Sequence, residues 1–134
     1  MSISPLELRL GNLVDVINEE GLVHGYTVFA ISNDSISVMK DGIGMVVEPK
    51  DLSPITLTED WVVKFGFIKS NDKALPIIDT YEKDGLVFDS DFVLTIEGKE
   101  GDLHSVGNPS KYVHQLQNLY LALTGTELTI KETV

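Results

Sequence analysis

Short apolar segments separated by turn residues fill the first 57 positions of the chain. The segments are rich in β-branched and aromatic side chains, which is typical of strands. Within residues 35–39, Ile36 and Val38 alternate with serines, the period of a strand with one buried face and one face in water. The pattern predicts strands at residues 13–17, 26–31, 35–39, 43–48 and 55–57.

The turns between these segments favour an antiparallel arrangement. Asp41-Gly42 suits a tight hairpin, because glycine accepts a positive φ without a steric penalty. After this turn, Ile43, Met45 and Val47 fall on one side of the next strand. Five short strands, with a proline-flanked turn before the last, resemble the SH3-like class and predict an SH3-like β-barrel over residues 1–56. That class hosts many unrelated functions.

The period changes to that of a helix at residues 58–66. Thr58 is placed to cap the helix, and Gly66 stands where a helix ends in a left-handed residue. Trp61, Val62 and Phe65 form the predicted buried stripe, with Trp61 in the core rather than in a ligand site.

Strand character returns between this helix and residue 106. The predicted strands are 77–82, 86–88, 92–96 and 103–106. In the third of them, Phe92, Leu94 and Ile96 are expected to form the apolar face. The second part, residues 57–134, is therefore predicted to be an antiparallel sheet with helices, and the whole chain an α+β protein.

The clearest helix pattern covers residues 109–124. Asn108 is the expected cap, Pro109 the first helical residue and Gly125 the C-terminal stop. Apolar residues at helical spacing predict one buried stripe. It consists of Tyr112, Val113, Leu116, Leu119, Tyr120 and Leu123.

His114, Gln117 and Leu121 are expected to point away from that stripe. Three interpretations of this face compete: an ordinary wet surface, a contact with a partner or a second copy, and catalysis by His114. Asn118, one turn after His114, can orient a ring but cannot act as a base, so catalysis is the least favoured. The candidate protein-contact residues are His114, Gln117 and Leu121.

Composition narrows the classes of function. The chain has 21 acidic and 10 basic residues, a net charge of -11, and the excess is spread along the sequence. Affinity for nucleic acid comes largely from cations that neutralise phosphates, so DNA, RNA and anionic membranes are poor partners. The acidity is expected to keep the protein soluble; the alternative is that it imitates nucleic acid.

No chemical motif in the sequence is strong. The chain has no cysteine, which excludes disulfides, thiolate metal sites and a cysteine nucleophile and suits a cytoplasmic protein. No apolar run approaches the ~20 residues that span a bilayer, and no export signal is visible. The segment 89–91, "DSD", is better explained as a turn than as a cation site. No cofactor, metal or catalytic residue is predicted.

Three segments carry a resemblance to a family. "YVHQLQNLYLALTGTEL", "LRLGNLVDV" and "ITLTEDWVVKFGF" resemble small uncharacterised proteins of gut bacteria and of their phages and prophages. The similarity runs over most of the chain, and the helix motif is its most specific part. The resemblance implies a genetic context and no activity. The residues that match the helix motif are Tyr112, His114, Gln115, Gln117, Asn118 and Tyr120.

The predicted function is that of a non-catalytic accessory or adaptor protein that acts through protein contacts and originates from a phage or mobile element. One alternative is an acidic inhibitor that imitates nucleic acid and targets a nucleic-acid-binding protein. Another is an enzyme whose site forms only in the fold. An adaptor should expose a continuous apolar patch, whereas an enzyme should gather histidines and carboxylates in a cleft.

Overall fold

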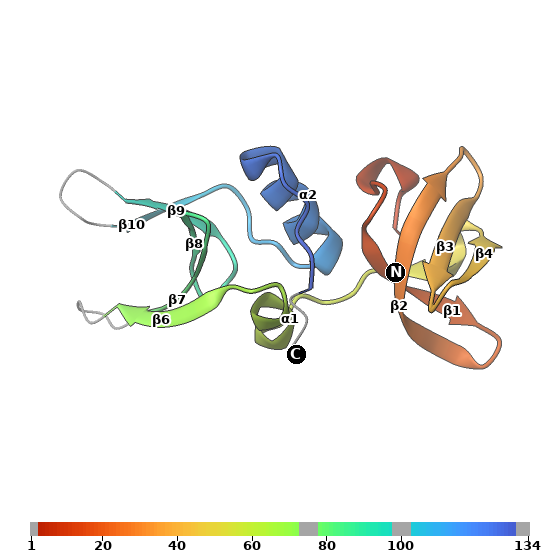
Figure 1. Ribbon diagram of the computed structural model, residues 1–134, viewed down its shortest axis with the longest axis horizontal. Helices are drawn as coiled ribbons and strands as arrows, with labels where there is room; N and C mark the ends of the chain where they lie inside the picture. Colours follow the sequence, from red (N-terminus) through yellow and green to blue (C-terminus); the bar gives the residue numbers. More distant parts are fainter. Residues whose placement is uncertain (1–2, 73–77, 98–102, 131–134) are drawn as a thin grey trace. The chain divides into compact units, whose positions relative to one another are not determined.

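The computed structural model describes residues 3–72, 78–97 and 103–130. It is a mixed α+β protein with two antiparallel sheets and two α-helices (Figure 1). The chain forms two compact units, one of residues 1–56 with 112–127 and one of residues 57–111 with 128–134. The units differ from the two predicted segments in one respect: the C-terminal helix groups with the first unit.

The first unit contains a five-stranded sheet in the order β4-β3-β2-β1-β5. Its strands are β1 (Leu13–Asn18), β2 (Gly21–Ile31), β3 (Ile36–Lys40), β4 (Ile43–Val47) and β5 (Leu52–Ser53). Two 3-10 turns, η1 (Pro5–Glu7) and η2 (Pro49–Asp51), flank them. Each neighbouring pair is antiparallel, and β4 does not pair with β5 in the described part of the chain, so no closed barrel is observed.

The β3–β4 hairpin forms where the sequence predicted it. Asp41 and Gly42 both have positive φ, 53° and 79°, the conformation of a type I′ turn that matches the twist of the flanking strands. The β1–β2 connection is tighter than predicted. β2 begins at Gly21, so a hairpin replaces the loop expected over residues 18–25.

The core of the first unit comes from alternate positions of these strands. Val14, Ile36, Val38 and Leu52 are fully buried, which confirms the predicted alternation in β3. The fifth strand is not where the sequence suggested. It lies at Leu52–Ser53, directly after η2, and residues 55–57 contribute only a single bridge.

The second unit contains a five-stranded meander in the order β10-β9-β8-β7-β6. Its strands are β6 (Ile68–Asp72), β7 (Ile78–Lys83), β8 (Leu86–Phe88), β9 (Leu94–Glu97) and β10 (Leu103–Val106). The sequence pattern missed β6. Position 77, predicted as the start of a strand, lies outside the described residues.

Helix α1 (Glu59–Lys64) precedes this meander. Thr58 is its N-cap residue, but its side chain makes no capping hydrogen bond. Gly66 has φ 93°, and the N–H of Phe67 donates to the carbonyl of Val62, so the predicted C-terminal stop is confirmed. Val62 and Phe65 are buried, as expected for the stripe, whereas Trp61, predicted to be in the core, is only partly buried.

The predicted apolar face of the strand at 92–96 is wrong. Phe92 has φ 62°, which is incompatible with a strand, and β9 starts two residues later at Leu94. The side chains of Val93 and Thr95 are buried instead of those of Phe92 and Leu94. The cause is the preceding turn, in which the Asp89 carboxylate accepts hydrogen bonds from the N–H groups of Asp91 and Val93.

Helix α2 (Val113–Thr124) begins four residues later than predicted. Its N-cap is Tyr112, whose N–H donates to the side chain of Gln115. The helix does not extend to Pro109 because the backbone before it is extended: Tyr112 forms a bridge with Thr56, and the N–H of Val113 donates to Ile55. Gly125, with φ 73°, ends the helix as predicted.

Candidate protein-binding site

The three residues proposed as a contact face do not form an outer surface. His114 and Gln117 are 1% and 2% exposed, and Leu121 is half-buried. The prediction that this face points outward is therefore wrong. Leu123, assigned to the buried stripe, is 46% exposed, so the buried side of α2 is rotated from the expected one. This side contains Val113, His114, Leu116, Gln117 and Tyr120.

Gln117 is buried because its amide completes the backbone of the segment before β1. Its Oε1 accepts from the N–H of Leu13 at 2.8 Å, and its Nε2 donates to the carbonyl of Gly11 at 3.1 Å. Gly11 has φ 93°, a conformation that favours glycine. A buried polar group is tolerated when it is hydrogen-bonded, and both ends of this amide are.

Asn118 extends this polar cluster. Its Oδ1 accepts from Arg9 Nε at 3.0 Å and from Asn12 Nδ2 at 2.8 Å, and its Nδ2 donates to the carbonyl of Glu7 at 3.0 Å. Arg9 also pairs with Glu127 at 2.7 Å. The uncharged amides of α2 thus fasten residues 7–13 to the helix, a structural role that periodicity could not reveal.

His114 has no chemical partner that would make it a catalyst. Its ring stacks on Tyr112 with centroids 5.9 Å apart, and neither ring nitrogen has a hydrogen-bond partner among the described residues. The nearest carboxylate oxygen, on Glu7, is 3.9 Å from Nε2, too far for a hydrogen bond. Burial lowers the pKa of His114 below its usual value, so the ring is neutral at pH 7.

Exposed apolar side chains lie instead on both faces of the first sheet around β4, with Ile43 and Met45 on one face and Val46 on the other. Phe29, Met39, Ile43, Met45 and Val46 are all exposed large hydrophobic residues. Ile43 is 73% and Val46 67% exposed, and only Val47 of β4 is buried. Ile43, Met45 and Val47 do share one side of the strand, as predicted, but two of the three are not covered.

Strand β4 is also an edge of the sheet. Lys40 pairs with Ile43 across the two-residue turn, and a pair flanking such a turn exchanges both backbone hydrogen bonds. Pairs along an antiparallel ladder alternate, so Met45 and Val47 also bond to β3. The N–H and C=O groups of Gly44 and Val46 consequently point to the side where β4 has no neighbouring strand.

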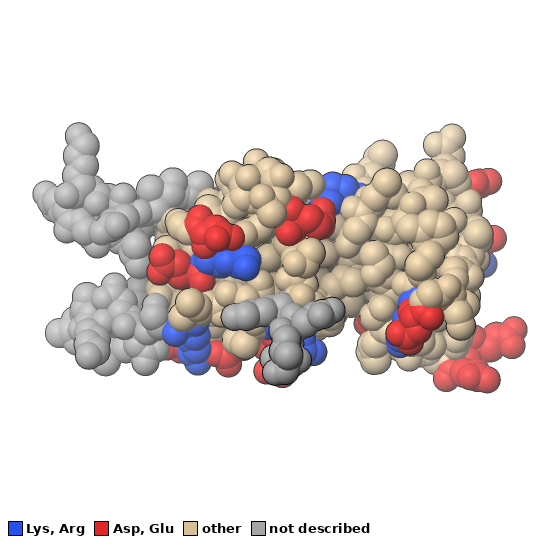
Figure 2. All heavy atoms as spheres, viewed as in Figure 1, with Lys and Arg blue, Asp and Glu red and all other residues tan. Residues whose placement is uncertain are grey.

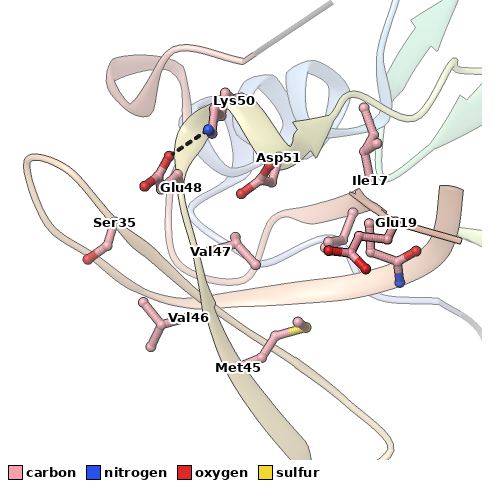
Figure 3. Close-up of a pocket in the computed structure, with 11 residues that line it drawn as sticks. Ile17, Glu19, Ser35, Met45, Val46, Val47, Glu48, Lys50 and Asp51 are labelled. Atoms are coloured by element: carbon pink, nitrogen blue, oxygen red, sulfur yellow. Dashed lines mark ion pairs between the residues drawn. The ribbon is translucent and has the colours of Figure 1, made fainter. Parts of the chain in front are cut away.

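A groove of about 650 Å³ runs beside this edge (Figure 3). Met45 and Val47 extend from β4 toward Ile17, which lies at the end of β1. Glu48, Lys50 and Asp51 border one end of the groove, and Ser35 lies on the other side of β4. The groove therefore has an apolar floor and a charged border.

The charged border is acidic. Glu19, Glu48 and Asp51 line the groove together with one cation, Lys50, whose Nζ is 3.3 Å from Glu48 Oε2. A ligand in the groove would thus meet a net negative charge. On the face drawn in Figure 2, the carboxylates form separate groups divided by uncharged surface.

The second unit holds a different charged cluster. Glu59 Oε1 is 2.7 Å from Lys69 Nζ and accepts from the Tyr81 hydroxyl at 3.2 Å, and Asp79 lies 3.7 Å from Lys69. The hydrogen bond that Lys69 donates to Glu59 lowers the pKa of Glu59 and raises the pKa of Lys69. Burial raises the pKa of Tyr81. Each pKa moves away from neutrality, the opposite of what acid–base catalysis requires, so this cluster is an ion pair at the start of α1.

The described residues also form no metal site and no membrane-spanning helix. No group of three or more histidines and carboxylates could hold a metal ion there. The segment 89–91 forms the expected turn, with Asp89 bonded to backbone N–H groups. None of the described helices combines the length and apolar character needed to cross a bilayer.

The β4 edge was not among the candidate sites predicted from the sequence. A signal was present: residues 43–47, "IGMVV", contain no charged residue and no proline, which are the usual protections of an edge strand. The strand order needed to recognise it as an edge becomes visible only in the structure.

Comparison with models of protein families, with curated proteins and with solved structures found no match to this chain.

Proposed function

We propose that this chain is a non-catalytic accessory or adaptor protein whose first unit binds another protein through the apolar surface around β4. One observation carries the proposal: Ile43, Met45 and Val46 are exposed on a strand with an open edge and beside a groove. An exposed apolar patch with a charged border is typical of protein-binding surfaces.

The proposal includes an SH3-like architecture for the first unit. The strand order and the 3-10 turn between β4 and β5 support it, since small barrels of this class are meanders in which the last strand pairs with the first. The origin in a phage or mobile element depends on the family resemblance of the α2 motif. Self-association through the same surface is the alternative partner.

The two other functions have less support. A nucleic-acid mimic should carry carboxylates in rows, and at the groove Glu48 is paired with Lys50 instead. An enzyme should gather titratable groups in a cleft, and the groove beside β4 is lined by carboxylates and one lysine without a histidine.

The test is to capture partners on the purified protein and on a Val46→Asp variant, from a lysate of the cells that naturally carry the chain. Val46 is exposed, so the variant should keep its melting temperature but lose the partner that the wild type retains. Leu6→Asp is the matched control, because Leu6 is 97% exposed and lies outside β4.

Light scattering on the same three proteins identifies self-association. Equal recovery of the same partners and equal mass for wild type and Val46→Asp would contradict the proposed surface. A loss shared by Leu6→Asp would show that any added charge has this effect.

A further inference from the structure

We propose that the open edge of β4 binds an extended peptide segment of a partner protein, which adds to the sheet as a strand and places Lys or Arg side chains beside Glu19, Glu48 and Asp51. This inference rests on the proposed function and specifies the class of partner and the mode of binding.

The backbone of β4 offers hydrogen-bond donors and acceptors on its open side. Register directs the N–H and C=O groups of Gly44 and Val46 away from β3. No described hydrogen bond of the turns and loops involves either residue. A peptide strand laid against β4 would supply partners for these groups, which is how strand addition obtains its affinity.

A groove lies on the open side of this edge. Its far wall is the end of β1, where β5 covers only Asp15 and Val16. Ile17 pairs with Leu22 between the hydrogen-bonded positions of the β1–β2 hairpin, so its N–H and C=O also point away from β2. The groove therefore lies between two strand segments that each have an open side. Its volume, about 650 Å³, is in the range of ligand-binding pockets.

The charge at the border of the groove selects the occupant. Glu19, Glu48 and Asp51 border the groove, and Lys50 is already paired with Glu48. A second copy of the chain would bring its own acidic border and a further net charge of -11 to the contact. A peptide that contains both apolar and basic residues fits better, because Met45 and Val47 line the same groove as the carboxylates.

The probe is a fluorescein-labelled peptide of four Val-Lys repeats, titrated with the full chain and followed by fluorescence anisotropy. Saturable binding is expected, weakening as salt is added. A Val-Glu peptide of equal length should bind at least tenfold more weakly. The Val-Lys peptide with N-methylated valines, which lacks half its backbone donors, should also lose at least tenfold.

Val46→Pro is the decisive variant. Proline removes the outward N–H of residue 46 and blocks the edge, while the β3–β4 bonds, made by Ile43, Met45 and Val47, are kept. Val46→Thr is the matched control, since it retains the N–H and the β-branched shape. The proline variant should lose at least tenfold in affinity for the Val-Lys peptide, and the threonine variant less than threefold.

A second variant tests the carboxylates of the groove and keeps the inference testable if Val46→Pro does not fold. Glu19→Gln with Glu48→Gln leaves the edge intact and should weaken binding and flatten its salt dependence. Circular dichroism and the melting temperature identify any variant that is not folded.

The outcomes separate this inference from the proposed function. If Val-Lys peptide fails to bind, or binds Val46→Pro and the N-methylated form as well as their parents, strand addition is overturned. If strand addition is overturned but Val46→Asp still fails to capture the partner that the wild type retains, the proposed function stands and the partner binds the surface in another way. Binding of the Val-Lys peptide to the wild type and to Val46→Thr, with loss of binding in Val46→Pro, supports both.

Discussion

At Gln117 an uncharged side chain in the middle of a helix completes the backbone of another segment. Its amide accepts from Leu13 and donates to Gly11, and the side chain is buried. A helical wheel places Gln117 outside the apolar stripe, so the pattern alone predicted a wet position. Gln117 is buried by contacts with residues that lie more than a hundred positions away in the sequence. A helical wheel represents the helix alone and cannot predict such contacts.

Replacing Gln117 by Leu tests this role. The N–H of Leu13 and the carbonyl of Gly11 would lose their partner, and each buried group left unpaired costs about 1–3 kcal/mol. Urea unfolding should show a clear loss of stability. Ala122→Gln, at an exposed position of the same helix, should change the free energy of unfolding by less than about 0.5 kcal/mol. Equal curves for the two variants would refute the structural role of Gln117.

His114 predicts a dependence of stability on pH. Burial lowers its pKa in the folded protein, whereas in the unfolded chain a histidine titrates near about 6.5. Below that pH the unfolded chain takes up a proton that the folded protein does not, so stability is lost as the pH falls through the unfolded value toward the folded one. The Glu7 carboxylate acts in the opposite direction and reduces the effect.

The measurement is denaturant unfolding of wild type and His114→Leu at pH 7.5, 6.5 and 5.5, values of about one unit on either side of the titration. The variant should lose less stability over this range than the wild type does. His24→Gln, at an exposed histidine, separates the effect from that of another imidazole. Parallel pH profiles for wild type and His114→Leu would show that His114 does not titrate in this way.

Among the elements, α2 shows what periodicity can and cannot predict. Its existence and its end at Gly125 follow from the sequence, because a glycine in a left-handed conformation stops a helix locally. Its start does not, because the bridge between Thr56 and Tyr112 keeps the chain extended past Pro109. The β3–β4 turn was predictable for the same local reason as the helix end. The strand that follows it was predicted, but its open edge was not.

Because the buried side of α2 is rotated from the predicted one, three leucines of this helix should differ in how much they contribute to the free energy of unfolding. Leu116 is buried, Leu119 is half-buried and Leu123 is exposed. Leu116→Ala should therefore cost about 2–5 kcal/mol, the usual range for a buried leucine, and Leu119→Ala less. Leu123→Ala should lie within about 0.5 kcal/mol of the wild type, as surface changes usually do. A larger loss at Leu123 than at Leu116 in urea unfolding would support the stripe expected from the sequence.

For the whole molecule, the sequence predicted an α+β protein in which an SH3-like barrel is followed by an antiparallel sheet with helices. Two antiparallel sheets and two helices are observed, and a closed barrel is not. The grouping of α2 with the first unit depends on contacts between the two ends of the chain. The candidate site depends on strand order, which places β4 at an edge. Both are long-range facts, and no local pattern in the sequence encodes either one.

The charge of the whole molecule makes the final prediction. The protein has 21 acidic and 10 basic residues, so acidic side chains outnumber the cations that could neutralise phosphates. It should therefore not bind DNA or RNA. At about 0.15 M salt, where the Debye length is about 8 Å, only close pairing could overcome the net charge of -11, and Lys50 at the groove is already paired with Glu48. Anisotropy of labelled duplex DNA and single-stranded RNA should stay flat across a titration in which a basic protein of similar size saturates the signal. The same nucleic acids should not compete with a Val-Lys peptide for the groove. At high concentration they would bind the free basic peptide in solution, which is a separate effect. Saturable micromolar binding of either nucleic acid, weakened by added salt, would contradict the inference from charge and reopen a nucleic-acid function for the chain.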